Sequence, residues 1–251
     1  MRHPNGGAIV LFGTGKYLET TDTATTGTQT YYGVWDNGKN DSSNTDRTKL
    51  LQQKIAGTKG YPPNVYRITT DYCIAAGSMS KPDIANTNAT MAACNDDWSS
   101  TSPLAKKGWF MDLPDSGERV AYNALLRNDR IVFPTLIPSE IPCEPGGSSW
   151  VMELDALTGR VLTESPFDIN LDGNFDATDN TALEFNKVKR IAGGIKPGEG
   201  GIFTTPTVIK DPKDPKKEFK YASTSAGAVV KTPESVSQNQ AGRISWREIV
   251  Q

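Results

Sequence analysis

Aspartate and asparagine side chains alternate with apolar residues along one segment, FDINLDGNFDATDN, which covers residues 167–180. Hydrated calcium-binding loops place oxygen ligands at alternate positions of a tight turn, so that they surround one cation. Clustered carboxylates also repel one another unless a cation lies between them. The segment therefore predicts a calcium site. Its expected ligands, the fourth acting through its backbone carbonyl oxygen, are Asp168, Asn170, Asp172, Asn174 and Asp176.

Further residues of the loop 168–179 fit this pattern. Gly173 falls at the position where the sharp turn requires glycine, and the intervening apolar side chains could anchor the loop. Asp179 either reaches the ion, as in a helix–loop–helix hand, or only caps a helix or turn, as in a β-hairpin version of the loop, which we favour. Hard oxygen ligands favour calcium, because magnesium prefers to keep several waters. A metal-free polar surface turn is the alternative.

Other reaction chemistries have few candidate residues. His3 is the only histidine, so Ser–His–Asp and Cys–His catalysis are not predicted, and no residue spacing indicates zinc. The sequence GTGK at 13–16 is part of a phosphate-loop pattern. However, Val10 stands where such a loop needs glycine and Tyr17 where it needs serine or threonine, so we expect a turn between strands. We predict no catalytic residues and no organic cofactor.

Three cysteines do not form a disulfide framework. Cys73 and Cys94 flank a polar segment, and Cys143 stands apart from both. One bridge could join Cys73 to Cys94 in an oxidising compartment, Cys73 could pair with Cys143 instead, or all three thiols could be unpaired.

Charge and length exclude several classes of protein. The net charge of −2, without a strongly basic run, gives no electrostatic basis for nucleic-acid binding. No apolar run reaches the roughly 18 residues that span a bilayer. No signal peptide precedes the apolar run at 8–12, so we expect either a cytoplasmic protein or a fragment of a larger exported precursor.

The elements that must position the loop are mainly strands. With 36% hydrophobic residues, 23 glycines and 16 prolines, the composition suits short strands joined by turns. We expect a helix at 45–55, a short helix at 179–185, and surface insertions at 76–105 and 210–218. Apolar runs of strand length predict strands at 8–12, 30–35, 108–113, 130–137, 149–154, 201–204, 206–209, 219–223 and 242–247.

One hairpin pattern favours a β-propeller. A strand ending in Leu-Asp is followed by the turn ALTG at 156–159 and then by a second strand at 160–162. A blade takes about 40 to 45 residues, so the chain supplies about three or four blades once insertions are set aside. We predict an all-β fold: a partial β-propeller of four-stranded antiparallel blades with loop insertions and one or two short helices. Residues 1–251 would form a single domain, the C-terminal portion of the propeller. The five tryptophans are expected to pack in the core.

Several stretches together resemble the PilY-type proteins of type IV pilus biogenesis and adhesion. They occur in order over nearly the whole chain, and Cys143 accompanies one of them: VLFGTGKYL at 10–18, YYGVWD at 31–36, GWFMDLP at 108–114, GERV at 117–120, FPTLIP at 133–138, GGSSW at 146–150, ELDALTG at 153–159, GIFTTPTV at 201–208 and GRISWR at 242–247. The resemblance implies the C-terminal propeller of a large exported protein. It also implies a calcium loop on which pilus extension and retraction depend, with the same five ligands as above.

The resemblance predicts a non-enzymatic module of a pilus-associated biogenesis factor or adhesin. Its location would be the pilus, the outer-membrane surface or the periplasm, and its partners would be pilins or minor pilins and a surface or host ligand. The alternative is a quinoprotein dehydrogenase-like enzyme, because LDALTG at 154–159 also resembles the repeat hairpins of that class. Those repeats recur and usually carry a tryptophan soon after the Thr-Gly step, whereas here Thr-Glu-Ser follows at 163–165.

Overall fold

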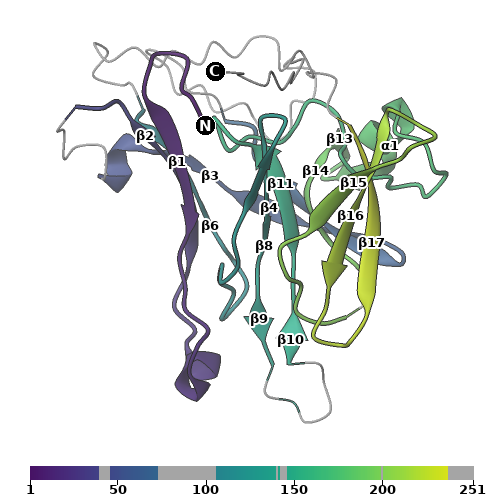
Figure 1. Cartoon of the computed structure of the whole chain (residues 1–251), viewed down its shortest axis with the longest axis horizontal. Helices are drawn as coiled ribbons and strands as arrows, with labels where there is room; N and C mark the ends of the chain where they lie inside the picture. Colours follow the sequence, from purple (N-terminus) through teal and green to yellow (C-terminus); the bar gives the residue numbers. More distant parts are fainter. Residues whose placement is uncertain (40–45, 73–105, 140, 142–145, 199, 237–251) are drawn as a thin grey trace, which may run out of the picture.

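The structure is a computed structural model, and it describes residues 1–39, 46–72, 106–139, 141, 146–198 and 200–236. Within these ranges the chain is mostly β, with one short α-helix, which confirms the all-β class. Its strands form a four-stranded, a six-stranded and a three-stranded sheet and two small ladders. The three larger sheets follow one another from left to right in Figure 1, with β1 and β2 on the left, β8 and β11 in the centre and β15, β16 and β17 on the right. No helix in the described ranges is both long and apolar enough to span a membrane.

The N-terminal sheet has the order β1-β2-β6-β3. Its strands are β1 (Ala8–Gly13), β2 (Thr30–Asp36), β3 (Leu51–Gln53) and β6 (Gly108–Asp112). Buried and partly exposed residues alternate along β2, as expected for a sheet with one face on the core. Trp35 and Trp109 are among the buried side chains that this sheet contributes to the first hydrophobic core.

The predicted helix at 45–55 is wrong. Within its described part, Arg47–Lys49 forms only a 3-10 turn, capped by the Asp46 carboxylate, and β3 follows at once. Leu51 and Gln53 are buried, with Gln52 between them half-buried. β3 pairs in parallel with β6, so backbone pairing and period-two burial override the weak helical pattern of this segment.

The central sheet has the order β4-β5-β14-β11-β8-β7. Its strands are β4 (Ile55–Tyr61), β5 (Asn64–Thr69), β7 (Leu125–Arg127), β8 (Arg130–Pro134), β11 (Val151–Asp155) and β14 (Ala192–Lys196). The second strand predicted at 160–162 does not form. On the edge of β11 opposite β8, β14 pairs only with Val151 and Met152. The returning chain meets this edge through one hydrogen bond, from the Asp155 N–H to the Arg160 carbonyl at 2.9 Å, and no ladder follows it. Instead the turn ends at Gly159, whose φ is +68° and whose backbone lies against the Trp109 ring.

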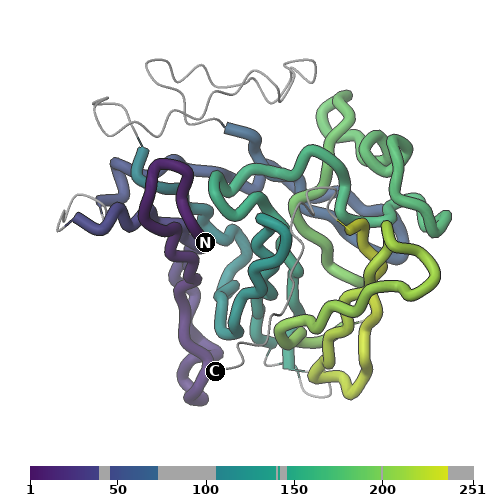
Figure 2. Tube along the Cα trace, turned by 45° about the horizontal axis from the view of Figure 1, so that its top comes forward, coloured from purple at the N-terminus to yellow at the C-terminus, as the bar shows by residue number. Residues whose placement is uncertain are grey.

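The C-terminal sheet contains β15 (Thr207–Lys210), β16 (Lys217–Ser223) and β17 (Val229–Ser235), in that order. The polar segment at 210–218 is largely the turn of the β15–β16 hairpin, not a longer insertion. The small ladders pair β9 (Ile137–Pro138) with β10 (Gly147–Ser148) and β12 (Leu183–Phe185) with β13 (Val188–Arg190). In the turned view the C-terminal sheet again lies on the side of the molecule opposite β1 and β2 (Figure 2).

The sheets are less uniform than the four-stranded antiparallel blades predicted. They contain four, six and three strands, and β3 pairs in parallel with β6. The expected burial of Trp35, Trp109 and Trp150 is confirmed. Other predictions fall outside the described residues: the strand at 242–247, the insertion at 76–105, the remaining two tryptophans and all three cysteines.

Candidate metal centre

The aspartate loop is anchored at its start in the second hydrophobic core. Phe167 and Ile169 are buried, and Phe167 bridges the C-terminal sheet by pairing with Glu234 of β17. The anchoring role predicted for the alternating apolar residues is therefore confirmed at Ile169. Leu171, by contrast, is 51% exposed, so it does not anchor the loop.

The Asp168 carboxylate organises the turn. It is buried, and its Oδ1 accepts a hydrogen bond from the Asp172 backbone N–H at 3.1 Å. Its Oδ2 accepts one from the Gly173 N–H at 2.9 Å. Gly173 has a φ of +84°, and Leu171 has a φ of +60°, which is uncommon for a branched residue. The glycine expected at the sharp turn thus adopts the left-handed conformation for which the sequence pattern requires it.

The middle of the loop carries the more exposed candidate ligands. The Asn170 side-chain amide donates to Asp172 Oδ2 and to Thr178 Oγ1, both at 2.9 Å. Asp172 Oδ1 accepts from the Asn174 N–H at 2.8 Å. The loop is therefore a series of local turns in which short polar side chains bind backbone two residues on.

Asp176 and Asp179 close the loop onto α1 (Ala177–Ala182), which overlaps the short helix predicted at 179–185. Asp176 is the N-cap, and hydrogen bonds from Thr178 hold the pKa of its carboxyl below its usual value. Asp179 is buried and accepts from the N–H groups of Ile169, Asn170 and Asp176. Burial, reinforced by the nearby Asp168 charge, raises the pKa of Asp179. Of the two roles left open for Asp179, these bonds match the cap.

The structure brings the five predicted ligands into one loop but does not turn their carboxylates toward one point. Across the described ranges, no three histidine, cysteine, aspartate or glutamate side chains are grouped as a metal site. The carboxylates are directed to backbone N–H groups, and the Lys217 ammonium donates to the Gly173 carbonyl oxygen at 3.0 Å. The donor chemistry fits a calcium ion, since hard oxygens alternate around a left-handed glycine.

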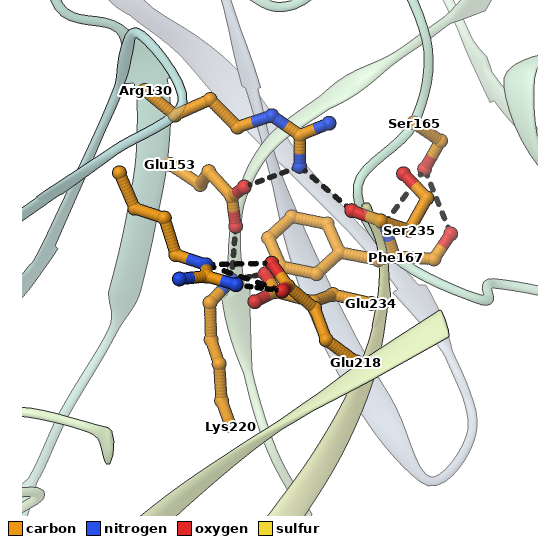
Figure 3. Close-up of polar contacts among 9 residues, drawn as sticks. Arg130, Glu153, Ser165, Phe167, Glu218, Lys220, Glu234 and Ser235 are labelled. Atoms are coloured by element: carbon orange, nitrogen blue, oxygen red, sulfur yellow. Dashed lines mark hydrogen bonds and ion pairs between the residues drawn. The ribbon is translucent and has the colours of Figure 1, made fainter. Parts of the chain in front are cut away.

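Sequence reasoning missed a buried charge cluster between the central and C-terminal sheets (Figure 3). The Lys220 ammonium pairs with both Glu153 and Glu234, and all three side chains are at most 3% exposed. Arg130 donates to Glu153 at 2.9 Å and to the Ser235 carbonyl at 3.1 Å. Arg127 and Glu218 form a further ion pair beside them. We refer to these six residues as the charge cluster: Arg127, Arg130, Glu153, Glu218, Lys220 and Glu234.

The pKa values of the two glutamates beside Lys220 are shifted in opposite directions. Burial opposes ionisation of Glu153, but Lys220 and Arg130 together hold its pKa below the usual value. Burial raises the pKa of Glu234 to about 8, with the Glu153 charge adding to the effect and Lys220 opposing it. A sequence signal existed, because Glu153 interrupts the apolar run WVMEL and Lys220 lies at an inward position of β16.

Comparisons with known proteins agree with the resemblance. The family model described as the PilY1 beta-propeller domain matches residues 1–59. The type IV pilus biogenesis factor PilY1 of Pseudomonas aeruginosa PAO1 is 25% identical over 99% of this chain, and a PilY1 homolog of Xylella fastidiosa Temecula1 is 28% identical over 62%. The chain spans only 20% and 9% of the lengths of these two relatives.

A solved structure supports the fold. The crystal structure of the P. aeruginosa PilY1 C-terminal domain matches 92% of this chain with a TM-score of 0.63, at 20% sequence identity. The match covers 43% of that domain. The described sheets therefore correspond to part of a PilY1 β-propeller, and the predicted relation to PilY-type proteins is confirmed.

Proposed function

From the premise that this chain is a relative of the PilY1 type IV pilus biogenesis factors with the fold of their C-terminal propeller, we propose that it is a non-enzymatic calcium-binding module of a pilus-associated protein. The observation that carries this proposal is the loop 168–179, in which the left-handed Gly173 and the buried Asp168 set up an alternation of oxygen donors. The turn at 156–159, which resembles quinoprotein repeats, packs on Trp109 as a structural corner and gives no support to catalysis.

The ion would be held by the carboxylates of Asp168, Asp172 and Asp176, by the Asn170 side-chain oxygen and by the Asn174 carbonyl oxygen. Bound calcium supplies positive charge that offsets the repulsion between these carboxylates. Asp179 would hold the loop without touching the ion, because it is only 1% exposed and its oxygens accept hydrogen bonds from three backbone N–H groups. Binding only to the folded loop would stabilise the protein by mass action.

At the level of the cell, we propose that the module belongs to an exported protein at the pilus, the outer-membrane surface or the periplasm. It would support pilus assembly, extension and retraction, and surface attachment. Its partners would be pilins or minor pilins and a surface or host ligand. The support for this step is the similarity to PilY1 proteins along nearly the whole chain.

Calcium calorimetry on metal-stripped protein tests the site. Asp172→Ala is the sharpest variant, because Asp172 is exposed and its carboxylate accepts only two local hydrogen bonds, from the Asn170 side-chain amide and the Asn174 N–H. Asp214→Ala is the matched control: Asp214 is also an exposed turn aspartate, and it accepts from the Lys216 N–H at 2.9 Å. We expect one site in the wild-type protein and in Asp214→Ala, and loss of binding in Asp172→Ala. Absence of binding to the folded wild type would reduce the loop to a polar turn.

Piliation tests the cellular role separately. Asp172→Ala is introduced into the full-length gene, and surface pili and twitching are measured against the Asp214→Ala strain. We expect both readouts to fall in the first strain alone. If calcium binding is lost and piliation is unchanged, the site is real and the pilus role of the ion is wrong.

A further inference from the structure

The outer edge of β17 is only partly paired. The regular ladder of β17 joins it to β16 from Val229 to Ser235, and its opposite edge meets the chain at Phe167. The Ser235 N–H donates to the Pro166 carbonyl, so Ser235 directs its backbone groups away from β16. Every second residue of a strand shares that direction, which places the backbone groups of Val229, Lys231 and Pro233 on the outer edge.

Pro233 supports this assignment independently. Proline lacks an N–H, so inside a paired strand it is tolerated where its nitrogen faces away from the neighbour. Because the β16–β17 register is continuous, Lys231 has the same orientation two residues earlier. Within the described residues the outward pairing of β17 is confined to the bridge at Phe167, so the N–H and C=O groups of Val229 and Lys231 are unpaired.

A groove with a volume of about 620 Å³ runs along this edge. One wall is β17 itself, and the other includes Pro63 and Asn64 at the tip of the β4–β5 hairpin. That hairpin tip lies beyond β17 on the right of Figure 1. The exposed apolar side chains that line the groove are Leu171 and Val229, and the nearly buried Phe167 and Ile195 form its floor.

The groove has one cationic group available to a ligand. Lys231 lines it, and its ammonium lies 3.8 Å from the centre of the Phe219 ring with no carboxylate partner among the described residues. Asp168 also lines the groove, but its two oxygens accept the backbone bonds of the loop. Backbone donors and acceptors, an apolar lining and a single cation suit an extended peptide.

We propose that this groove binds an extended peptide segment of a partner protein. The segment pairs with Val229 and Lys231 as a fourth strand of the C-terminal sheet. Alternate side chains of the segment are apolar and face Phe167 and Ile195, and an acidic side chain meets Lys231. A three-stranded sheet whose outer edge is largely unpaired within the described part of the chain, beside a groove, is the arrangement that strand addition completes. This inference does not depend on calcium binding.

The test uses the full chain in calcium-containing buffer and a display library of random peptides about ten residues long, enough to span β17 at about 3.4 Å per residue. Enriched peptides are synthesised and measured by fluorescence anisotropy. Lys231→Pro removes the outward N–H without touching the pairing with β16, and Val229→Pro does the same at the next outward position. Lys231→Ala is the matched control, because it keeps the N–H.

We expect enriched peptides to alternate apolar and acidic residues and to lose at least tenfold in affinity for both proline variants. The loss for Lys231→Ala should be only a few-fold, and bound peptide should protect the Val229 and Lys231 amides from hydrogen exchange. Melting curves verify that each variant folds. Three results would overturn the proposal: no enrichment over the bare support, equal binding to the proline variants, or a dimer of this chain joined through β17.

Discussion

Glu234→Gln should remove a pH dependence of stability that the charge cluster imposes. In the folded protein the pKa of Glu234 is raised to about 8, mainly by burial, while the ordinary value is 4.5. The native state therefore keeps a proton that the unfolded chain releases. Stability from this proton is fully present below about pH 4.5 and is lost as the pH rises through about 8. Glutamine keeps the neutral shape and hydrogen-bonding capacity of the protonated acid, but it cannot titrate.

The size of this change in unfolding free energy follows from the difference between the folded and unfolded pKa values of Glu234. Each unit of difference between the folded and unfolded pKa corresponds to about 1.4 kcal/mol, so the contribution changes by up to about 3 kcal/mol between pH 5 and pH 8. Glu153 does not cancel it, because its pKa is lowered and its contribution is lost only below pH 4.5. His3 acts in the opposite sense below pH 6.5, since burial lowers its pKa to about 4. The difference between wild type and variant removes the His3 contribution.

Urea unfolding at several pH values from 5 to 8 measures that difference. We expect the wild type to lose up to about 3 kcal/mol of unfolding free energy relative to Glu234→Gln as the pH rises. Glu184→Gln serves as the control, because Glu184 is 54% exposed and its ion pair with Lys189 lies on the surface. The unfolding free energy of the wild type minus that of Glu234→Gln should fall as the pH rises. A difference that stays constant or increases with pH would refute the assignment of the retained proton to Glu234.

Three further substitutions test the packing that carries the sheets. Gly159→Ala should lower the unfolding free energy, measured by thermal unfolding, by about 2 kcal/mol or more, because the φ of Gly159 is +68° and a Cβ would lie 2.3 Å from the Trp109 ring. Its control is Gly227→Ala, where φ is +80° but the space is open, and the expected loss is about 1 kcal/mol. Arg119→Met should lower the unfolding free energy by about 3 kcal/mol and expose residues 16–25 to proteolysis. The reason is that the Arg119 guanidinium donates hydrogen bonds to the carbonyls of Gly117, Lys16, Asp22 and Thr25. Unchanged resistance to proteolysis would show that these bonds do not hold the segment. Arg67→Met should cost about 3 to 5 kcal/mol by leaving buried Glu118 unpaired, and adding Glu118→Leu should recover most of the loss in urea unfolding.

The strands that sequence reasoning could predict are those whose own residues favour a half-buried sheet. β1, β2, β6 and β11 are apolar, aromatic or β-branched runs, and each lies within a residue or two of its predicted bounds. β14, with the sequence AGGIK, gives no such signal. Its glycines are required by packing, because a Cβ on Gly193 would lie 2.3 Å from Thr69 and one on Gly194 2.5 Å from Met152.

In the candidate site, too, local features follow from the sequence and features that depend on tertiary contacts do not. Ligand types and spacing in the loop are local, so the sequence predicts the turn at Gly173 and the helix that follows. The Asp179 role depends on which backbone groups lie within reach, and three of them come from the folded loop. The ion-paired partners of the charge cluster are up to 91 positions apart in the sequence, as Arg127 and Glu218 are, so only the tertiary structure brings them together.

Lys217 links the loop to the C-terminal sheet and should limit calcium affinity. Its ammonium donates to the Gly173 carbonyl and lies 5.9 Å from the Phe175 ring, so a positive charge sits beside the place where a second cation would bind. Lys217→Met should therefore tighten calcium binding about fivefold at low salt, as expected for removing an exposed like-charge contact worth about 1 kcal/mol. The gain should shrink as salt screens the charges.

Calcium calorimetry at two salt concentrations measures this effect, with Lys216→Met as the neighbouring control. Lys216 is exposed and adjacent in sequence, so it shares the general charge of the hairpin but makes no hydrogen bond to Gly173. A weaker affinity in Lys217→Met would reverse the interpretation: the hydrogen bond to Gly173 would then organise the loop more than the charge opposes the ion. Either result would show that calcium affinity depends on β16, because Lys217 at the start of β16 contacts the loop. The same strand supplies Lys220 to the buried charge cluster.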